Sequence, residues 1–389
     1  MTKTITSQTV MGRNIALYIH FPFCRRKCNY CSFVSYQCRE ADIPAYVSAV
    51  QQELAACATG QRVCSIYFGG GTPSLLSPKQ FEGLLSDIHS LFIIDNTAEI
   101  TIEANPGTVD ESYLAAIREL GINRLSLGVQ SLDDEELALL GRIHSSAEAR
   151  DTLLFARNAG FANVSLDLIY GLPGQNIYSW KDTLDEVIKL APEHLSLYPL
   201  SLENDVPISL AIERGEIPDI DPDRSADQYE LAEDLLTVHG YGHYEISNWA
   251  KEGWECRHNM AYWKNLPYLG IGVAAHSCMD GHRFANTTDL DRYLDASLLN
   301  IEMPRGMDEE IWPELQLSET VILGLRLNTG VNLDDIQRRF GIDLLRLYGQ
   351  QINELAISGL LECVDRYVRL TRRGRLLGNE VFWRFLPDS

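Results

Sequence analysis

The chain has 389 residues, of which 45% are hydrophobic and 22% are charged, as expected for a folded protein of about two domains. Its formal net charge of −21 argues against nucleic acid as a main partner, because phosphate backbones bind basic surfaces. The nine cysteines follow no disulfide pattern, and neither a secretory signal nor a membrane span is visible, so we expect a protein of the reducing cytoplasm.

Short apolar segments that favour strands alternate with longer amphipathic segments that favour helices. The predicted strands are residues 15–20, 63–68, 98–103, 124–128, 163–169 and 194–198. The predicted helices between them are residues 45–58, 78–91, 111–120, 147–159 and 178–190. This alternation predicts an α/β fold whose parallel strands form a partial (β/α)6 barrel of the TIM type, with every strand-to-helix loop at one end.

The pattern changes after Leu200. Residues 224–239 are predicted to form one helix, and residues 241–282 are rich in aromatic residues and histidine with little periodicity. The tail contains predicted helices at 315–325, 333–340 and 344–358, a strand pair at 361–370 and a final helix after 374. We therefore expect a core of residues 1–305 and a small winged-helix-like domain of residues 306–389. The second domain has no excess of basic residues, so we do not expect it to bind DNA.

Residues whose side chains or backbone could bind a ligand follow the predicted strands at their C-terminal ends. They are a cysteine motif after the first strand, a Gly-Gly-Gly-Thr-Pro run after the second, then Glu103, Gln130 and Asp167 on the next three. In barrels and in open α/β sheets this is the end at which binding sites form. The sequence therefore predicts one composite site.

The cysteine motif consists of Cys24, Cys28 and Cys31, with no fourth cysteine at a ligand spacing. Thiolates spaced in this way are typical ligands of an iron–sulfur cluster. Three thiolates on a [4Fe-4S] cluster would leave one iron open to a small molecule. The alternative is a structural zinc loop, which requires four protein ligands, and the nearest further cysteine, Cys38, lies seven residues away.

Together these motifs resemble the radical S-adenosylmethionine (SAM) enzymes, in the branch of the oxygen-independent coproporphyrinogen III oxidases. The matching segments are Tyr18-Ile-His-Phe-Pro-Phe-Cys24, Gly69-Gly-Gly-Thr-Pro-Ser74, Glu103-Ala-Asn-Pro106, Leu127-Gly-Val-Gln-Ser131 and Asp167-Leu-Ile-Tyr-Gly-Leu-Pro-Gly-Gln175. The resemblance covers about residues 14–280, and the tail from residue 306 resembles the C-terminal domain of the same family.

The resemblance implies that SAM binds the open iron and is cleaved by one electron to a 5′-deoxyadenosyl radical. It places Tyr18 beside the cluster, Gly71 at the methionine end of SAM, and Glu103 on a hydroxyl or ammonium group. The further SAM positions that it implies are Tyr30, Thr72, Pro73, Gln130, Arg142 and Asp167. Alternative readings are a surface residue at a helix end for Arg142 and turn residues for Asp167, Glu103 and Gln130, and the glycine run could be a simple tight turn.

Two departures point to the branch of this family known as the heme chaperone HemW. In the oxidases a fourth cysteine follows the third after one intervening residue, whereas here Cys31 is followed by Ser32 and Phe33, and only 23 residues precede Cys24. In addition, the segment His258-Asn-Met-Ala-Tyr-Trp263 resembles a motif of the chaperone branch. Histidine is a common ligand of heme iron, so His258 is a candidate heme ligand, with a structural histidine as the alternative. Cys256 is a further conceivable ligand.

We therefore expect a protein that binds a [4Fe-4S] cluster, SAM and heme and transfers heme to acceptor hemoproteins, with membrane-bound respiratory enzymes as candidate acceptors. The alternative is an enzyme that converts coproporphyrinogen III to protoporphyrinogen IX by oxidative decarboxylation. These two readings leave open whether the protein is an enzyme, and no catalytic residue is assigned.

Overall fold

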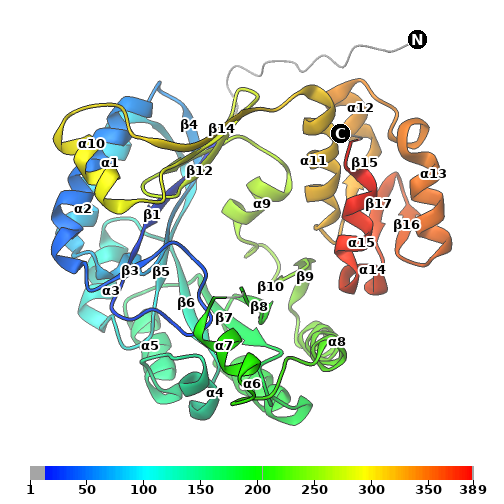
Figure 1. Ribbon diagram of the computed structural model, residues 1–389, viewed down its shortest axis with the longest axis horizontal. Helices are drawn as coiled ribbons and strands as arrows, with labels where there is room; N and C mark the ends of the chain where they lie inside the picture. The colour runs from blue at the N-terminus through cyan, green and yellow to red at the C-terminus, as the bar shows by residue number, and fades with distance from the viewer. Residues whose placement is uncertain (1–13, 204, 388–389) are drawn as a thin grey trace.

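A computed structural model describes residues 14–203 and 205–387 of the chain. Its centre is a mixed sheet of twelve strands, in the order β14-β13-β12-β11-β1-β4-β5-β6-β7-β8-β10-β9 (Figure 1). The six predicted strands form its parallel middle part, and their prediction is confirmed. They are β1 (Ile15–Phe21), β4 (Arg62–Gly70), β5 (Ile93–Ala104), β6 (Arg124–Gln130), β7 (Val164–Tyr170) and β8 (His194–Pro199).

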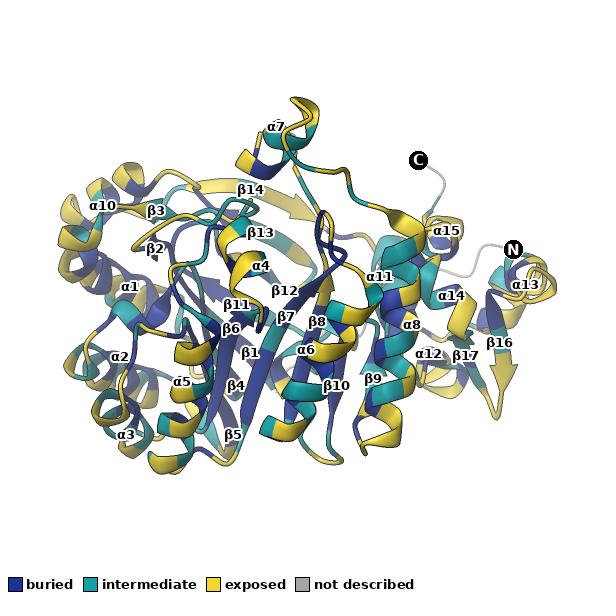
Figure 2. Cartoon of the chain, turned by 90° about the horizontal axis from the view of Figure 1, so that it is seen from below, coloured by how far each residue is buried: buried dark blue, intermediate teal, exposed yellow. Residues whose placement is uncertain are grey.

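Helices cover the outer face of this sheet, and the strands beneath them are buried (Figure 2). They are α1 (Ile43–Cys57), α2 (Pro78–Leu91), α3 (Glu111–Glu119), α5 (Ser146–Asn158), α6 (Ile177–Leu190) and α8 (Pro222–Val238), whereas α4 (Asp134–Leu139) lies against the cysteine loop. Side-chain caps fix several helix starts, including full capping boxes at Ser77 and Ser145 and an N-cap at Asp110. These local signals explain why the sequence located the helices.

The segment after Ala250 contributes a strand that the sequence did not predict. β11 (Tyr268–Ile271) runs parallel to β1, with Leu17 opposite Leu269. The sheet then continues through the antiparallel strands β12 (His276–Met279), β13 (His282–Asn286) and β14 (Arg305–Glu310), and on its far side through β10 (Asn248–Ala250) and β9 (Gly242–Glu245). Since the two edges do not pair, the barrel is partial. α9 (Arg257–Trp263) packs against β1 and β4 beside this open part.

The strands alternate between two chemical faces. Apolar residues such as Ile66, Leu125 and Leu166 are almost fully buried under the helices, each contributing about 2 kcal/mol. The intervening residues face the barrel interior and are mostly polar, namely Ser65, Tyr67, Glu99, Thr101, Glu103, Arg124, Ser126, Ser165, Asp167, His194 and Ser196. A TIM barrel normally fills its interior with branched apolar side chains, so this interior is unusual.

The C-terminal part has its own apolar core, which includes Leu317, Val321 and Phe385. It contains α11 (Pro313–Leu325), β15 (Val331–Asn332), α12 (Leu333–Phe340), α13 (Leu344–Ile357), β16 (Leu361–Val364), β17 (Tyr367–Leu370), α14 (Arg372–Leu376) and α15 (Gly378–Phe382). The predicted helices and strand pair are confirmed. The boundary at residue 306 stays a prediction, and β14 belongs to the large sheet.

The remaining elements are short or peripheral. They are β2 (Phe23–Cys24), β3 (Tyr36–Gln37), α7 (Pro207–Glu213) and α10 (Leu290–Leu298). Of these, α7 packs near the cysteine loop, where the backbone N–H of Ile208 donates to the carbonyl of Asn29 at 3.1 Å. Within the described ranges, every helix is too short or too polar to cross a membrane.

Candidate functional site

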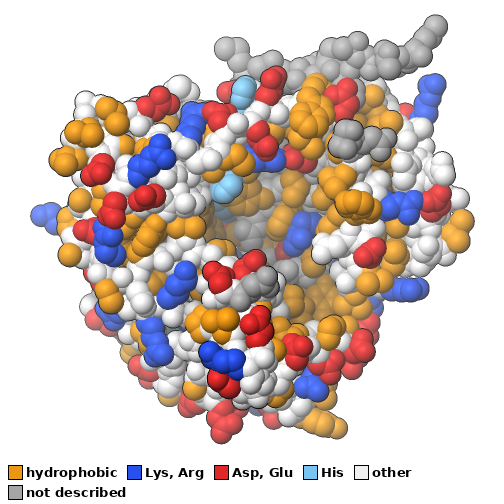
Figure 3. All heavy atoms as spheres, in the orientation of Figure 1, with side chains coloured by type: hydrophobic (Ala, Val, Ile, Leu, Met, Phe, Trp, Pro, Cys, Tyr) orange, Lys and Arg blue, Asp and Glu red, His pale blue; other side chains and the backbone are white. Residues whose placement is uncertain are grey.

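A cavity of about 600 Å³ lies at the C-terminal ends of the parallel strands and extends into the barrel interior. The face of the molecule that Figure 3 shows is hollowed near its centre. Of the residues predicted from the sequence, the cavity is lined by Tyr18, Cys24, Cys28, Tyr30, Cys31, Gly71, Thr72, Glu103, Gln130, Arg142, Asp167 and His258. Pro73 is buried in a short helical turn behind this wall. The structure thus brings the predicted residues together.

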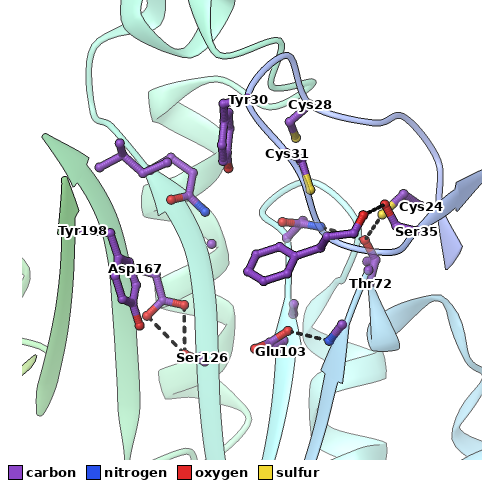
Figure 4. Close-up of a pocket in the computed structure, with 18 of the residues that line it drawn as sticks. Cys24, Cys28, Tyr30, Cys31, Ser35, Thr72, Glu103, Ser126, Asp167 and Tyr198 are labelled. Carbon is purple, nitrogen blue, oxygen red and sulfur yellow. Dashed lines mark hydrogen bonds between the residues drawn. The ribbon is translucent and has the colours of Figure 1, made fainter. Parts of the chain in front are cut away.

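The three cysteines lie on one loop at the mouth of the cavity, all half-buried (Figure 4). The Thr72 hydroxyl is 3.7 Å from Cys24 Sγ, and Arg142 Nη1 donates to Cys28 Sγ at 3.4 Å. Burial raises the pKa of the Cys24 and Cys31 thiols. These thiols are therefore protonated in the free protein, and metal binding at this loop would release protons.

The three thiols of this loop are compatible with an iron–sulfur cluster. Among residues 14–203 and 205–387, no three Cys, His, Asp or Glu side chains are arranged around one ion position. A cluster of four irons takes its thiolates on different irons, so its ligands need not converge on one point. Gly71 also keeps the space beside the loop free, because a Cβ there would lie 3.0 Å from Cys24 Sγ and 2.6 Å from the carbonyl oxygen of Phe23.

Arg142 points into the protein and not to the surface. Its Nη2 donates to the carbonyl of Gly128 at 2.6 Å and also to the side chain of Asn105. Asn105 in turn donates to the Thr72 hydroxyl at 2.9 Å. This network links the ends of β4, β5 and β6 to the cysteine loop. The arrangement disfavours the reading of Arg142 as a solvated surface residue.

Two carboxylates stand on the cavity wall below the cysteines. Glu103 accepts from the Tyr67 hydroxyl at 2.9 Å and from the backbone N–H of Gly70 at 3.1 Å, and burial raises its pKa to about 7. Asp167 accepts from the Ser126 hydroxyl at 2.9 Å, and burial raises its pKa as well (Figure 4). Burial outweighs the positive charge of the nearby Arg124, which partly offsets the rise in the pKa of both groups, so the wall still suits a cationic ligand.

Gln130 ends β6 with a φ of +68°. This left-handed conformation is rare for residues other than glycine, and such strain concentrates at binding sites. The strand pairing shifts between Leu127 and Gln130, so the last residues of β6 leave the regular register. The bulge brings Gln130 onto the cavity wall.

His258 lies at the inner end of the cavity and is 1% exposed. Its Nδ1 is 3.0 Å from the Ser65 hydroxyl, and its Nε2 is 3.1 Å from the Tyr262 hydroxyl. Burial, and secondarily the charge of Arg124, lowers its pKa to about 3. The ring is therefore neutral near pH 7. Cys256, by contrast, is fully buried, and its thiol lies 3.5 Å from Glu99 Oε1 and not on the cavity wall.

Comparison with known proteins assigns the family. Residues 18–187 match the radical SAM superfamily, and residues 313–377 match the HemN C-terminal domain. The chain is 35% identical to the heme chaperone HemW of Lactococcus lactis, over 96% of this chain and 97% of that protein. It is 41% identical to HemW of Synechocystis, over 81% of this chain and 79% of that protein. The chain belongs to the HemW family.

A solved structure supports the same fold. Coproporphyrinogen III oxidase (HemN) from Escherichia coli, a radical SAM enzyme, matches with a TM-score of 0.84 at 25% identity, covering 96% of this chain and 90% of that one. The expected radical SAM core followed by a C-terminal domain is therefore confirmed. Membership of the superfamily implies a [4Fe-4S] cluster and SAM, and the three-thiol loop and the acidic wall are compatible with both.

Several residues that line the cavity of this HemW-family protein were not predicted from the sequence. They are Tyr67, Asn105, Arg124, Ser126, Ser196 and Tyr198. The sequence did carry a signal for them, because polar and apolar residues alternate in the predicted strands. In a parallel sheet that is covered by helices, both faces of each strand are expected to be buried. Such strands are normally apolar throughout, so polar residues at every second position indicate an interior that is not a packed core.

Proposed function

We propose that this protein is a heme chaperone that binds a [4Fe-4S] cluster through Cys24, Cys28 and Cys31, binds SAM beside it, and carries heme to acceptor hemoproteins. The observation that carries the proposal is that the cysteine loop and His258, some 230 residues apart, line one cavity. The identity to proteins named heme chaperone HemW over nearly the whole chain supports the same reading.

In this proposal the residues at the mouth of the cavity hold SAM. Gly71 and Thr72 offer backbone and hydroxyl groups, Glu103 faces a cationic or hydroxyl group, and the Arg142 network orients the loop. The other SAM residues that we propose are Tyr18, Tyr30, Pro73, Gln130 and Asp167. A reduced cluster would supply one electron to the sulfonium of SAM. The protein's own contribution is to position the ligand and to keep water away from it.

The residues at the inner end are proposed to receive heme. His258 already has the arrangement of many axial ligands, with Nδ1 held by Ser65 while Nε2 points to an exchangeable hydroxyl on Tyr262. The ring centroids of Tyr67 and Tyr262 each lie 5.0 Å from the ring centroid of His258. These rings offer flat apolar surface to a macrocycle. Binding requires Nε2 to exchange the tyrosine hydroxyl for iron.

We further propose a cytoplasmic location and acceptors that include membrane-bound respiratory enzymes. Free thiols and an oxygen-sensitive type of metal site favour a reducing compartment. Heme is largely apolar, so its transfer requires direct docking of carrier and acceptor and not diffusion through water.

The proposal can be tested by reconstituting the cluster anaerobically and offering heme or coproporphyrinogen III with SAM. A heme absorbance band that persists through gel filtration and passes to an added apo-hemoprotein is the expected result. Formation of protoporphyrinogen IX would instead establish the oxidase activity, which the HemN-like fold makes the natural second candidate. Failure to retain heme at all would overturn the chaperone function.

A further inference from the structure

A buried arginine at the inner end of the cavity has unused hydrogen-bonding capacity. Arg124, the first residue of β6, is 2% exposed and lines the cavity. Within the part of the chain that the structure describes, its Nε has no hydrogen-bond partner, and the nearest carboxylate oxygen, Glu99 Oε2, is 4.0 Å away. Burying a guanidinium without full pairing is costly, so an anionic ligand at this position would stabilise it.

Glu99 does not form a hydrogen bond with the Arg124 guanidinium, because its carboxylate accepts hydrogen bonds from the backbone of α9. Its Oε2 accepts from the backbone N–H of Arg257 at 3.2 Å, and its Oε1 accepts from that of His258 at 3.1 Å. Glu99 thus anchors the start of α9 to the sheet and stands between Arg124 and His258. The guanidinium has five N–H donors in a planar fork, a geometry that matches a carboxylate.

The position of Arg124 along β6 indicates which ligand could supply a carboxylate to it. The residues proposed for SAM lie at the C-terminal ends of the strands, and Gly128 at that level is four residues further along β6. At about 3.3 Å per residue this separates Arg124 from the SAM level by roughly 13 Å. The amino acid end of SAM is expected at the cysteine loop, so its carboxylate would not reach Arg124.

We propose that Arg124 binds a propionate carboxylate of the heme that this protein carries. The inference rests on the proposed chaperone function and deepens it, because it orients the cargo with one propionate at the start of β6 beside the His258 ring. The two other acids of the wall, Glu103 and Asp167, stand higher on their strands and accept from Tyr67 and Ser126. Burial raises the pKa of both carboxyl groups and the charge of Arg124 partly offsets this rise, but among the described residues neither group is hydrogen-bonded to Arg124.

The first test compares two ligands on the unchanged protein, and the second compares variants of Arg124. Cluster-reconstituted wild type is titrated with heme and with heme dimethyl ester, in which both carboxylates are masked. We expect the wild type to bind heme on the order of 10- to 100-fold more tightly than the ester. Arg124→Gln should bind both ligands with the weaker affinity, and Arg124→Lys should keep part of the preference. Equal wild-type affinity for the two ligands would overturn the inference while leaving the chaperone function intact.

Two controls distinguish a contact between Arg124 and heme from a general effect of charge and from a contact with SAM. Arg150→Gln makes the same change on the outer face, where Arg150 pairs with Glu186, and should keep the full preference for heme. SAM and its decarboxylated analogue should show the same affinity ratio in wild type and in Arg124→Gln. A ratio that collapses only in the variant would assign the carboxylate to SAM and overturn the inference. A wild type that binds neither heme nor its ester would overturn both this inference and the proposed function.

Discussion

The two ends of the cavity are built in different ways. At the mouth, half-buried thiols sit on a loop between the strands and the outer helices. At the inner end, His258 and Arg124 are 1% and 2% exposed and are fixed on an ordered helix and strand. The mouth therefore offers partly accessible thiols, whereas the inner end offers side chains that are almost fully enclosed. The difference suggests that the mouth serves the cofactor and the inner end selects the cargo.

The strongest test of this division is Cys28→Ser. We expect the brown colour and the iron content to fall to near background, since the variant lacks one of three proposed thiolate ligands. Far-ultraviolet circular dichroism should not change, because Cys28 itself lies outside the apolar core clusters. Cys38→Ser changes an exposed cysteine that does not line the cavity, and this variant should keep its iron. A full complement of iron in Cys28→Ser would remove the cluster from the proposed function.

The next test addresses the inner end through His258→Ala. We expect heme retention to weaken by about 10- to 100-fold if the ring binds iron, with cluster iron unchanged. The free energy of unfolding should also fall by about 2–4 kcal/mol, since a buried ring and two hydrogen bonds are lost.

Ser65→Ala is the matched control for this variant. It removes the partner of His258 Nδ1 but keeps the ring. It should lower stability by about 1 kcal/mol and heme affinity by a few-fold. If both variants lost only stability and kept full heme affinity per folded molecule, His258 would be a structural residue.

A smaller effect is expected from the pH dependence at the mouth. The pKa of Glu103 is about 7, so its charge develops between about pH 6 and pH 8. SAM is a cation at its sulfonium and should bind up to about 10-fold more tightly as pH rises through this range. Glu103→Gln should remove the trend in equilibrium dialysis. A flat wild-type profile would contradict the contact between Glu103 and SAM.

The same pKa has the opposite effect on the stability of the free protein. The folded state holds the Glu103 proton more tightly than the unfolded state, whose glutamates titrate near 4.3, so stability declines as pH rises from about 4.5 to 7. We expect the wild type to lose on the order of 1–3 kcal/mol more than Glu103→Gln between pH 5 and pH 8, as measured by urea unfolding.

The smallest effect is predicted for Ser126→Ala, on the strand between the two ends. Asp167 would lose the Ser126 hydroxyl but would keep that of Ser165 at 3.1 Å. We expect a loss of about 1 kcal/mol in unfolding free energy and no change in cluster iron. A large loss of heme or iron in this variant would show that the two ends are not independent.

The sequence predicted most of the repeating part of the fold but not the segment that completes the cavity. The six parallel strands and their covering helices follow from apolar periodicity and from caps such as Ser77 and Ser145, which are local signals. β11 has only four residues and pairs with β1 from the other end of the barrel domain. A strand that short carries too little pattern to be distinguished from a loop, and its pairing depends on contacts far apart in the chain.

By itself, the sequence determined the spacing of Cys24, Cys28 and Cys31 and their place after the first strand, because both depend only on neighbouring residues. It also placed the other motif residues at one edge, since parallel strands with helical crossovers leave no other arrangement. Only the tertiary structure decided that Arg142 turns inward, that Arg124 faces the cavity, and that His258 joins the cysteine loop in one space. Those outcomes depend on how distant segments pack, and no local pattern encodes that packing.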